Sequence, residues 1–113
     1  MNIKKFFIYS ADLNPGCGTE PGKIRPVVVI QTNLLNNVHP STIICPITSK
    51  LSSGVKILRI RLNEKVNKLK KESDILIDQI RAIDNKRFIE EIGILSKNQQ
   101  LKVMESLKNL IFE

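Results

Sequence analysis

The chain has 113 residues, 42% of them hydrophobic, so it is long enough for one domain with one core and too short for two. Its formal net charge of +7 at pH 7 points toward a polyanionic partner, although many basic proteins bind nucleic acid only nonspecifically. Residues 1–60 carry seven Lys or Arg against two Asp or Glu, whereas residues 61–113 carry eleven against nine, so most of the excess lies in the first half.

The N-terminal segment begins with Lys4-Lys5 and the apolar run Phe6–Ala11, which resembles the start of a secretory signal. Asp12 ends that run short of the roughly 7 to 15 apolar residues that such a signal needs. No window approaches the roughly 20 apolar residues of a membrane span. Cys17 and Cys45 lack the spacing of a metal-binding pair. We therefore expect a cytoplasmic protein that does not associate with membranes.

Five short segments rich in β-branched residues are separated by Asn, Pro, Gly and Ser, a pattern typical of strands joined by turns. These segments are Phe6–Asp12, Arg25–Thr32, Thr42–Thr48, Val55–Leu62 and Ser73–Ile80. Because no helical crossovers separate them, they predict an antiparallel sheet, and closing it into a small barrel would remove its exposed edges. The run Val27–Ile30 does not alternate, which predicts a central strand covered on both faces. Cys45 is expected to be a small core residue.

The last segment has the pattern of a helix. Ser96 followed by Gln99 forms a capping-box signature. Apolar residues then recur at three- and four-residue spacing, at Leu101, Met104, Leu107, Leu110 and Ile111. We expect this stripe to pack on the barrel, an interpretation favoured over a partner-binding face. The basic stretch Lys65–Lys71 is interpreted as a solvated loop or a single helical turn, in preference to a contact with an RNA backbone.

Several familiar kinds of catalytic site are excluded. His39 is the only histidine, so a pair of histidines cannot act as acid and base. Gly16, Gly18 and Gly22 are not followed by the Gly-Lys-Ser/Thr turn of a nucleotide-hydrolase phosphate loop. Nothing in the sequence resembles a metal cage, and no metal or other cofactor is expected.

A pairing of polar residues at strand ends remains. Arg25 begins the second predicted strand, and Thr48 ends the third. If these strands are antiparallel neighbours, a guanidinium suited to phosphate and a hydroxyl lie at the same end of the sheet. From spacing alone, an ordinary surface ion pair for Arg25 and a structural role for Thr48 are equally good interpretations.

Four segments in order resemble the MazF/PemK family of toxin endoribonucleases. They are Ala11–Asn33 (ADLNPGCGTEPGKIRPVVVIQTN), Pro46–Ser49 (PITS), Ser73–Asp84 (SDILIDQIRAID) and Ile92–Ser96 (IGILS), and they span almost the whole chain. The resemblance implies one domain over residues 1–113, mainly β with a C-terminal helix, in the small SH3-like β-barrel of CcdB/PemK-type toxins. It also implies a homodimer that cleaves single-stranded RNA, usually messenger RNA, at short sequences without a metal. A MazE-like antitoxin protein is the implied partner.

The resemblance also assigns roles to individual residues. The catalytic arginine of the family's RP motif matches Arg25, and its catalytic threonine matches Thr48. Glu20 and Asp78 are the carboxylates at motif positions. Either carboxylate could help to activate the ribose 2′-hydroxyl or could orient Arg25, and orientation is favoured for Glu20. For Asp78, an ion pair that supports the sheet or dimer is as good an interpretation as catalysis.

Five further residues are implied to contact RNA. They are Thr19, Lys23, Ser49, Ser73 and Gln79. Ser73 and Gln79 can both donate and accept hydrogen bonds, as recognition of the base edges of a single strand requires. Thr19 and Lys23 are interpreted as base and phosphate contacts.

The first loop departs from the family pattern. Relatives commonly carry GSEQGGxRP where this chain has GTEPGKIRP, so Pro21 and Lys23 alter the loop. Proline removes a backbone donor, and lysine adds a charge, so the cleavage sequence is expected to differ. Two alternatives remain open: a noncatalytic binding protein on the same fold, like the CcdB poisons of DNA topoisomerase, or an inactive homologue that titrates an antitoxin.

Overall fold

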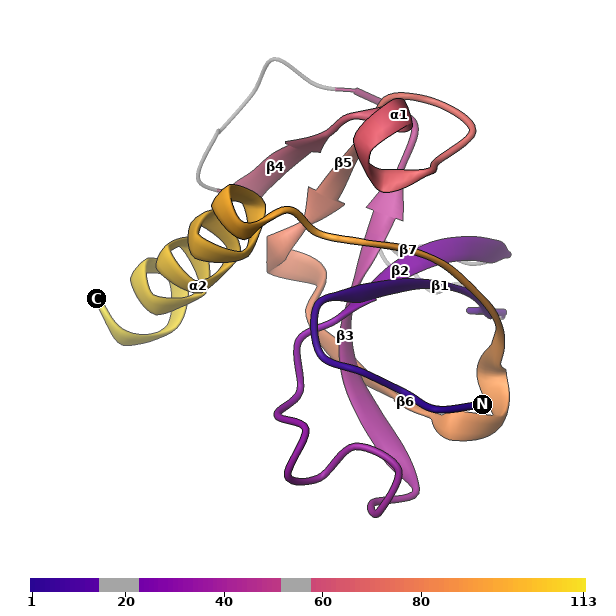
Figure 1. Ribbon diagram of the computed structural model, residues 1–113. Helices are drawn as coiled ribbons and strands as arrows, with labels where there is room; N and C mark the ends of the chain where they lie inside the picture. The colour runs from indigo at the N-terminus through magenta and orange to yellow at the C-terminus, as the bar shows by residue number, and fades with distance from the viewer. Residues whose placement is uncertain (15–22, 52–57) are drawn as a thin grey trace.

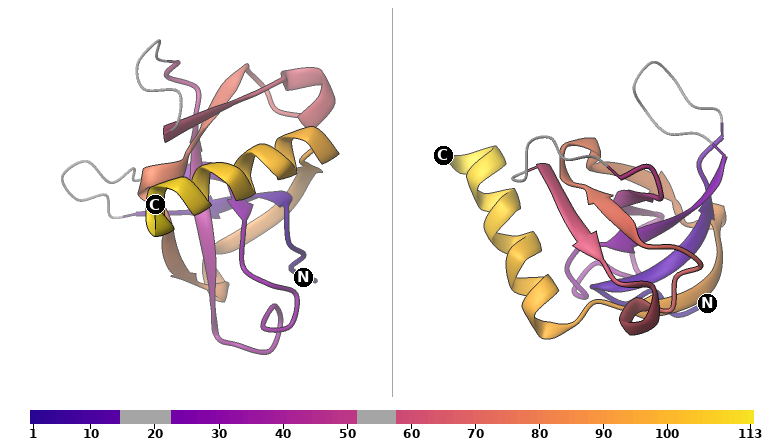
Figure 2. Two further views of the ribbon diagram at one scale, coloured as in Figure 1. Left: turned by 90° about the vertical axis from the view of Figure 1, so that its left-hand side faces the viewer. Right: turned by 90° about the horizontal axis from the view of Figure 1, so that it is seen from above.

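The computed structural model describes residues 1–14, 23–51 and 58–113. A curved sheet of seven antiparallel strands makes up most of this part of the chain, with the helix α2 lying along one side (Figures 1 and 2). The strands are β1 (Phe7–Asp12), β2 (Ile24–Val29), β3 (Ser41–Thr48), β4 (Arg59–Leu62), β5 (Ser73–Leu76), β6 (Arg81–Asp84) and β7 (Phe88–Ile94). The helices are α1 (Glu64–Asn67) and α2 (Lys97–Phe112), with short 3₁₀ turns η2 (Ile77–Gln79) and η3 (Asn85–Arg87).

The eight-residue strand β3 connects the two halves of the sheet. Its pairing with β2 places Val27 opposite Pro46, Val28 opposite Cys45 and Val29 opposite Ile44. On its other edge, β3 pairs first with β6 and then, at its C-terminal end, with β5. The strand order is β4-β5-β3-β2-β1-β7, with β6 branching from β3.

The expectation that β2 is covered on both faces is confirmed. Val27, Val28 and Val29 are all fully buried, and the three side chains divide between two hydrophobic clusters. Val28 joins the cluster that contains Cys45 and Ile75 of β5, while Val27 and Val29 join the cluster around Tyr9. Burial raises the pKa of the Cys45 thiol to about 12, in keeping with the core position expected for it.

The predicted strands agree with the structure in the first half of the chain and less well in the second. The expected strand Val55–Leu62 is described only from β4 onward, since residues 52–57 lie outside the described part. The expected strand Ser73–Ile80 ends at Leu76, because η2 follows directly. The strands β6 and β7 were not predicted.

The missed strand β7 contains two irregularities in its pairing with β1. The register shifts between Ile8 and Tyr9 and again between Ser10 and Ala11. Each such irregularity exchanges the faces on which the following side chains lie, so the alternation of polar and apolar residues that marks a strand is lost.

The mainly β architecture with a C-terminal helix is confirmed, but the barrel is not closed by hydrogen bonds. Among the described residues, β4 and β7 stand at the two ends of the strand order and do not pair with each other. Instead, α1 contacts β7 across this opening. The sheet therefore curves in the manner of a barrel without a continuous ladder (Figure 2).

The capping box predicted for the last helix is present at Ser96 and Gln99. The prediction that its apolar stripe packs in the core is wrong for most of its members, since Leu101 and Ile111 are each 52% exposed and Met104 is 43% exposed. The helix contacts the sheet chiefly at β4 and η2. Val103 and Leu107, one turn apart, therefore supply its inward face.

The first residues of the stretch Lys65–Lys71 belong to the single helical turn α1, which agrees with the interpretation of this stretch as a helical turn. Asn67 ends that turn and is fully buried. Its side-chain amide donates to Ile94 O at 2.9 Å and to Gln99 Oε1 at 2.8 Å, and Gln99 Nε2 donates back to Asn67 Oδ1 at 3.0 Å. This amide pair joins α1 to β7 and to the first turn of α2.

Gly93 makes the contact between α1 and β7 possible. A Cβ atom at this position would collide with the backbone oxygen of Asn67. We predict that Gly93→Ala lowers the free energy of unfolding by about 1–3 kcal/mol, as overpacking does, because the obstructing atom belongs to the backbone. Urea denaturation followed by circular dichroism measures this change.

The control is Glu90→Ala, which changes an exposed residue of the same strand. An unchanged urea midpoint for Gly93→Ala would contradict the close packing of β7 against α1.

Neither described helix has the length and continuous apolar character that crossing a bilayer requires.

Candidate functional site

Arg25 and Thr48 lie at the same end of neighbouring strands. The condition set for their convergence is met, because β2 and β3 are antiparallel neighbours with Val27 opposite Pro46. Two residues farther toward this end, β2 carries Arg25 and β3 carries Thr48. On its other side, Arg25 pairs with Ala11 of β1. The backbone of Arg25 is thus held in the ladder with β1.

An open groove of about 850 Å³ lies at this end of the sheet. It is lined by residues of β1, β2, β3, β5 and β7 and by the segment between α1 and β5. Four residues singled out from the sequence line it together: Lys23, Arg25, Ser49 and Ser73. The motifs that are far apart in the sequence therefore meet at one groove.

Thr48 lies beside this groove and is only 6% exposed. It is not among the described residues that line the groove, but its neighbours Ile47 and Ser49 are. Its hydroxyl oxygen accepts a hydrogen bond from Lys50 N at 3.1 Å. Across the sheet, Thr48 pairs with Asp74 of β5.

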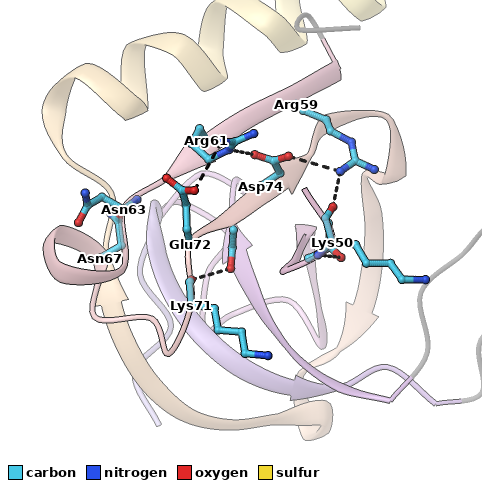
Figure 3. Close-up of polar contacts among 10 residues, drawn as sticks. Lys50, Arg59, Arg61, Asn63, Asn67, Lys71, Glu72 and Asp74 are labelled. Atoms are coloured by element: carbon cyan, nitrogen blue, oxygen red, sulfur yellow. Dashed lines mark hydrogen bonds and ion pairs between the residues drawn. The ribbon is translucent and has the colours of Figure 1, made fainter. Parts of the chain in front are cut away.

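A buried carboxylate holds the strands at this position (Figure 3). Asp74, whose side chain is 2% exposed, accepts a hydrogen bond from Arg61 Nε at 2.6 Å and another from Arg59 Nη1 at 3.4 Å. The hydrogen bond to Asp74 raises the pKa of Arg61. Arg59 also donates to Lys50 O at 2.8 Å. The residues that follow Thr48 are thus tied to β4 and β5.

Lys23 has an unusual backbone conformation. Its φ of 67° lies in the left-handed region that favours glycine. Its amide donates to Asn14 Oδ1 at 2.6 Å, and its carbonyl accepts from Leu13 N at 2.8 Å. Relatives with the GSEQGGxRP pattern carry glycine at this position, so the substitution places a charged side chain beside Arg25 at a cost in backbone strain.

The remaining predicted residues lie elsewhere. Asp78 and Gln79 are in η2, with Asp78 exposed, and neither is among the groove-lining residues of the described chain. Thr19, Glu20 and Pro21 lie outside the described residues.

The groove also contains residues that sequence analysis did not assign to it. Lys68, Lys70 and Lys71 line it, as does the β7 segment Ile89–Ile92. Ser10 of β1 lines it too, and its hydroxyl is the one buried side-chain polar atom of the described residues without a hydrogen-bond partner. In the sequence, the run of lysines was the only indication that any of these residues would lie at the groove.

Positive charge predominates in the groove. Its described lining includes four lysines and Arg25 against two carboxylates, Glu90 and Glu91. Glu91 forms an ion pair with Lys4 at 3.2 Å, so part of the acidic charge is already compensated. Such a surface attracts a polyanion, and a guanidinium fork within it suits a phosphodiester.

The sequence profile of the family described as "PemK-like, MazF-like toxin of type II toxin-antitoxin system" matches residues 4–111. The chain belongs to this family. The resemblance drawn from its four motifs is therefore confirmed.

Individual relatives agree with this assignment. The chain is 36% identical over 105 residues to the endoribonuclease MazF of Staphylococcus epidermidis, which covers 93% of this chain and 88% of that protein. MazF from Deinococcus radiodurans superposes with a TM-score of 0.85 at 21% identity, covering 100% of this chain and 99% of that one. A chain of the MazE–MazF complex from Deinococcus radiodurans gives a TM-score of 0.79 at 18% identity, covering 99% and 97%. These superpositions confirm the expected MazF-type fold.

We predict that Asp74→Asn lowers the free energy of unfolding by about 1.5–3 kcal/mol, because it removes the charged acceptor of two arginine hydrogen bonds at a buried position. Thermal or urea denaturation measures the loss.

Glu72→Gln is the matched control. Glu72 is 3.6 Å from the same Arg61, but its side chain is 52% exposed. Removing an exposed pair costs about 0–1 kcal/mol. Equal effects of the two substitutions would contradict the importance of the buried carboxylate.

Proposed function

We propose that this MazF/PemK-family chain is an endoribonuclease toxin that cleaves single-stranded RNA, messenger RNA in particular, at short sequences without a metal ion. The observation that carries the proposal is the position of Arg25, which is the second residue of β2 and lines a cation-rich groove together with residues of three other family motifs. The endoribonuclease relative at 36% identity supports the same activity and favours it over the noncatalytic alternatives.

The proposed reaction is attack of a ribose 2′-hydroxyl oxygen on the adjacent phosphorus. The O2′–P bond forms as the P–O5′ bond breaks, the 2′-hydroxyl loses its proton, and the leaving 5′-oxygen gains one. The products are a cyclic 2′,3′-phosphate and a 5′-hydroxyl end. Negative charge grows on the phosphoryl oxygens in the transition state, and a fixed guanidinium stabilises this charge without having to reorganise.

The roles of the other residues follow from their chemistry and position. Thr48 donates a hydrogen bond to the phosphate, because a hydroxyl that accepts from Lys50 N still has its own proton to donate. Ser49, Ser73 and Lys23 contact the RNA from their places in the groove. From the family motif alone, Glu20 is assigned to orient Arg25.

Three further assignments come from the family motifs alone. Thr19 and Gln79 contact bases, and Asp78 either supports catalysis or stabilises the sheet or dimer.

The physiological assembly follows the family. A homodimer of this single domain, residues 1–113, acts in the cytoplasm and is neutralised by a MazE-like antitoxin. The description of the family as toxins of type II toxin-antitoxin systems supports such a partner, as does the MazE–MazF complex of the Deinococcus radiodurans relative.

We predict that Arg25→Ala lowers kcat for RNA cleavage by about 10²–10³-fold, the usual effect of removing one preorganised donor to a transition-state oxyanion. The purified chain is incubated with a long RNA in EDTA, and the cut ends are mapped by primer extension. Wild-type protein should give discrete cuts with 5′-hydroxyl ends.

Lys86→Ala provides the control, since it removes one positive charge from exposed η3, outside the groove. Intact RNA at micromolar wild-type protein would overturn the proposed activity. Full cleavage by Arg25→Ala would overturn only the role of this residue.

A further inference from the structure

We propose that Lys68, Lys70 and Lys71 form a subsite for the RNA backbone, in the same groove as Arg25. The segment Lys68–Lys71, called the lysine loop below, lies between α1 and β5. The inference rests on the proposed function, because it assigns part of the substrate-binding surface of that activity. It concerns phosphates that flank the cleaved one.

The lysine loop displays its charges toward the groove from an ordered backbone. All four of its residues line the groove. Leu69 is 9% exposed and belongs to the hydrophobic cluster that contains Val28 and Cys45. The three lysines around it are exposed. Burial of Leu69 therefore fixes the middle of the loop while the ammonium groups remain in solvent.

Both ends of the loop are also fixed. At its start, Lys68 adopts φ 60° as the C-cap of α1, and its amide donates to Glu64 O. The preceding residue, Asn67, is held by the amide pair with Gln99. At its end, the Ser73 hydroxyl donates to Lys71 O at 2.9 Å (Figure 3). A fixed loop loses less conformational freedom when it binds a ligand than a mobile one does.

The lysines of the loop form no ion pair within the described chain. The four ion pairs of the described residues do not include the lysines of the loop. The two nearest acidic residues in sequence, Glu72 and Asp74, are paired with Arg61. The ammonium groups are therefore available for an external anion.

A phosphate backbone fits this surface better than bases do. No aromatic residue is among those of the described chain that line the groove, so bases cannot stack there. Lysine binds phosphate as a point charge, without the geometric requirements of base recognition. The subsite should strengthen binding of many RNA sequences equally and leave the choice of cleavage sequence to other residues.

The test compares two triple variants of the full-length chain. Lys68→Gln, Lys70→Gln and Lys71→Gln together remove the subsite. The matched control is the combination Lys97→Gln, Lys102→Gln and Lys108→Gln, which removes the same charge from exposed positions of α2, outside the groove. Circular dichroism melts verify that both variants fold.

Two quantities are measured, both on an RNA that contains a mapped cleavage site. The first is the effect of the substitutions on kcat and on KM, determined separately. The second is the salt dependence of Kd for the same RNA with a 2′-deoxy sugar at the cleaved position, which prevents attack. The loss of three phosphate contacts should reduce the magnitude of the slope of log association constant against log salt concentration by about 2. It should also raise KM roughly 10- to 100-fold with little change in kcat.

Equal KM and equal salt slopes for the loop variant and the α2 control would overturn the subsite, even if wild-type protein cleaves normally. The subsite is also overturned if the loop substitutions weaken binding of an acidic peptide but leave RNA binding unchanged, since the lysines would then serve a protein partner. If wild-type protein does not cleave RNA at all, the proposed function fails, and the salt dependence of Kd for an unmodified single-stranded RNA then decides whether the lysines bind the backbone.

Discussion

The pairing of β3 with its neighbours is the constraint on which the rest of the molecule depends. β3 pairs with β2 on one edge and with β5 and β6 on the other, so β2 and β5, which both line the groove, meet at this strand. Its side chains contribute to both hydrophobic clusters, Cys45 and Ile47 to one and Ile44 to the other. A slip of one residue would exchange these faces and separate the strand ends that carry Arg25 and Thr48. Register, core and site are thus set together.

Rigidity and charge serve the proposed chemistry in complementary ways. The buried ladder and the Asp74 ion pairs hold the strand ends, so a phosphate would meet donors that are already in place. The excess of lysine and arginine in the groove attracts the polyanion over longer range and is sensitive to salt. The sheet determines the position of a guanidinium near the start of a paired strand, whereas a mobile loop does not hold a guanidinium in one place.

Much of the fold and part of the site follow from the sequence. The first three strands were predictable because β-branched runs between turn residues are local signals, as is the capping box at Ser96. Antiparallel pairing predicted that Arg25 and Thr48 lie at one end of the sheet, whereas Ser49 and Ser73 were assigned to the site only by the family resemblance. The strand β7 was not predicted because its pairing irregularities remove the alternation of polar and apolar residues. The exposure of the α2 stripe was not predicted because contacts with β4 and η2 decide which face of the helix is buried. The lysine loop owes its place to the contact between Asn67 and Gln99, 32 residues apart, which no local pattern reveals.

The most direct test of the central claim is a crystal structure of the protein with an RNA that carries a 2′-deoxy sugar at its cleaved position. We predict that the scissile phosphate lies in the groove, with the Arg25 guanidinium about 2.7–3.1 Å from a phosphoryl oxygen, and that the flanking backbone passes the lysine loop. RNA bound on another face of the molecule, with Arg25 out of contact with any phosphate, would contradict the account.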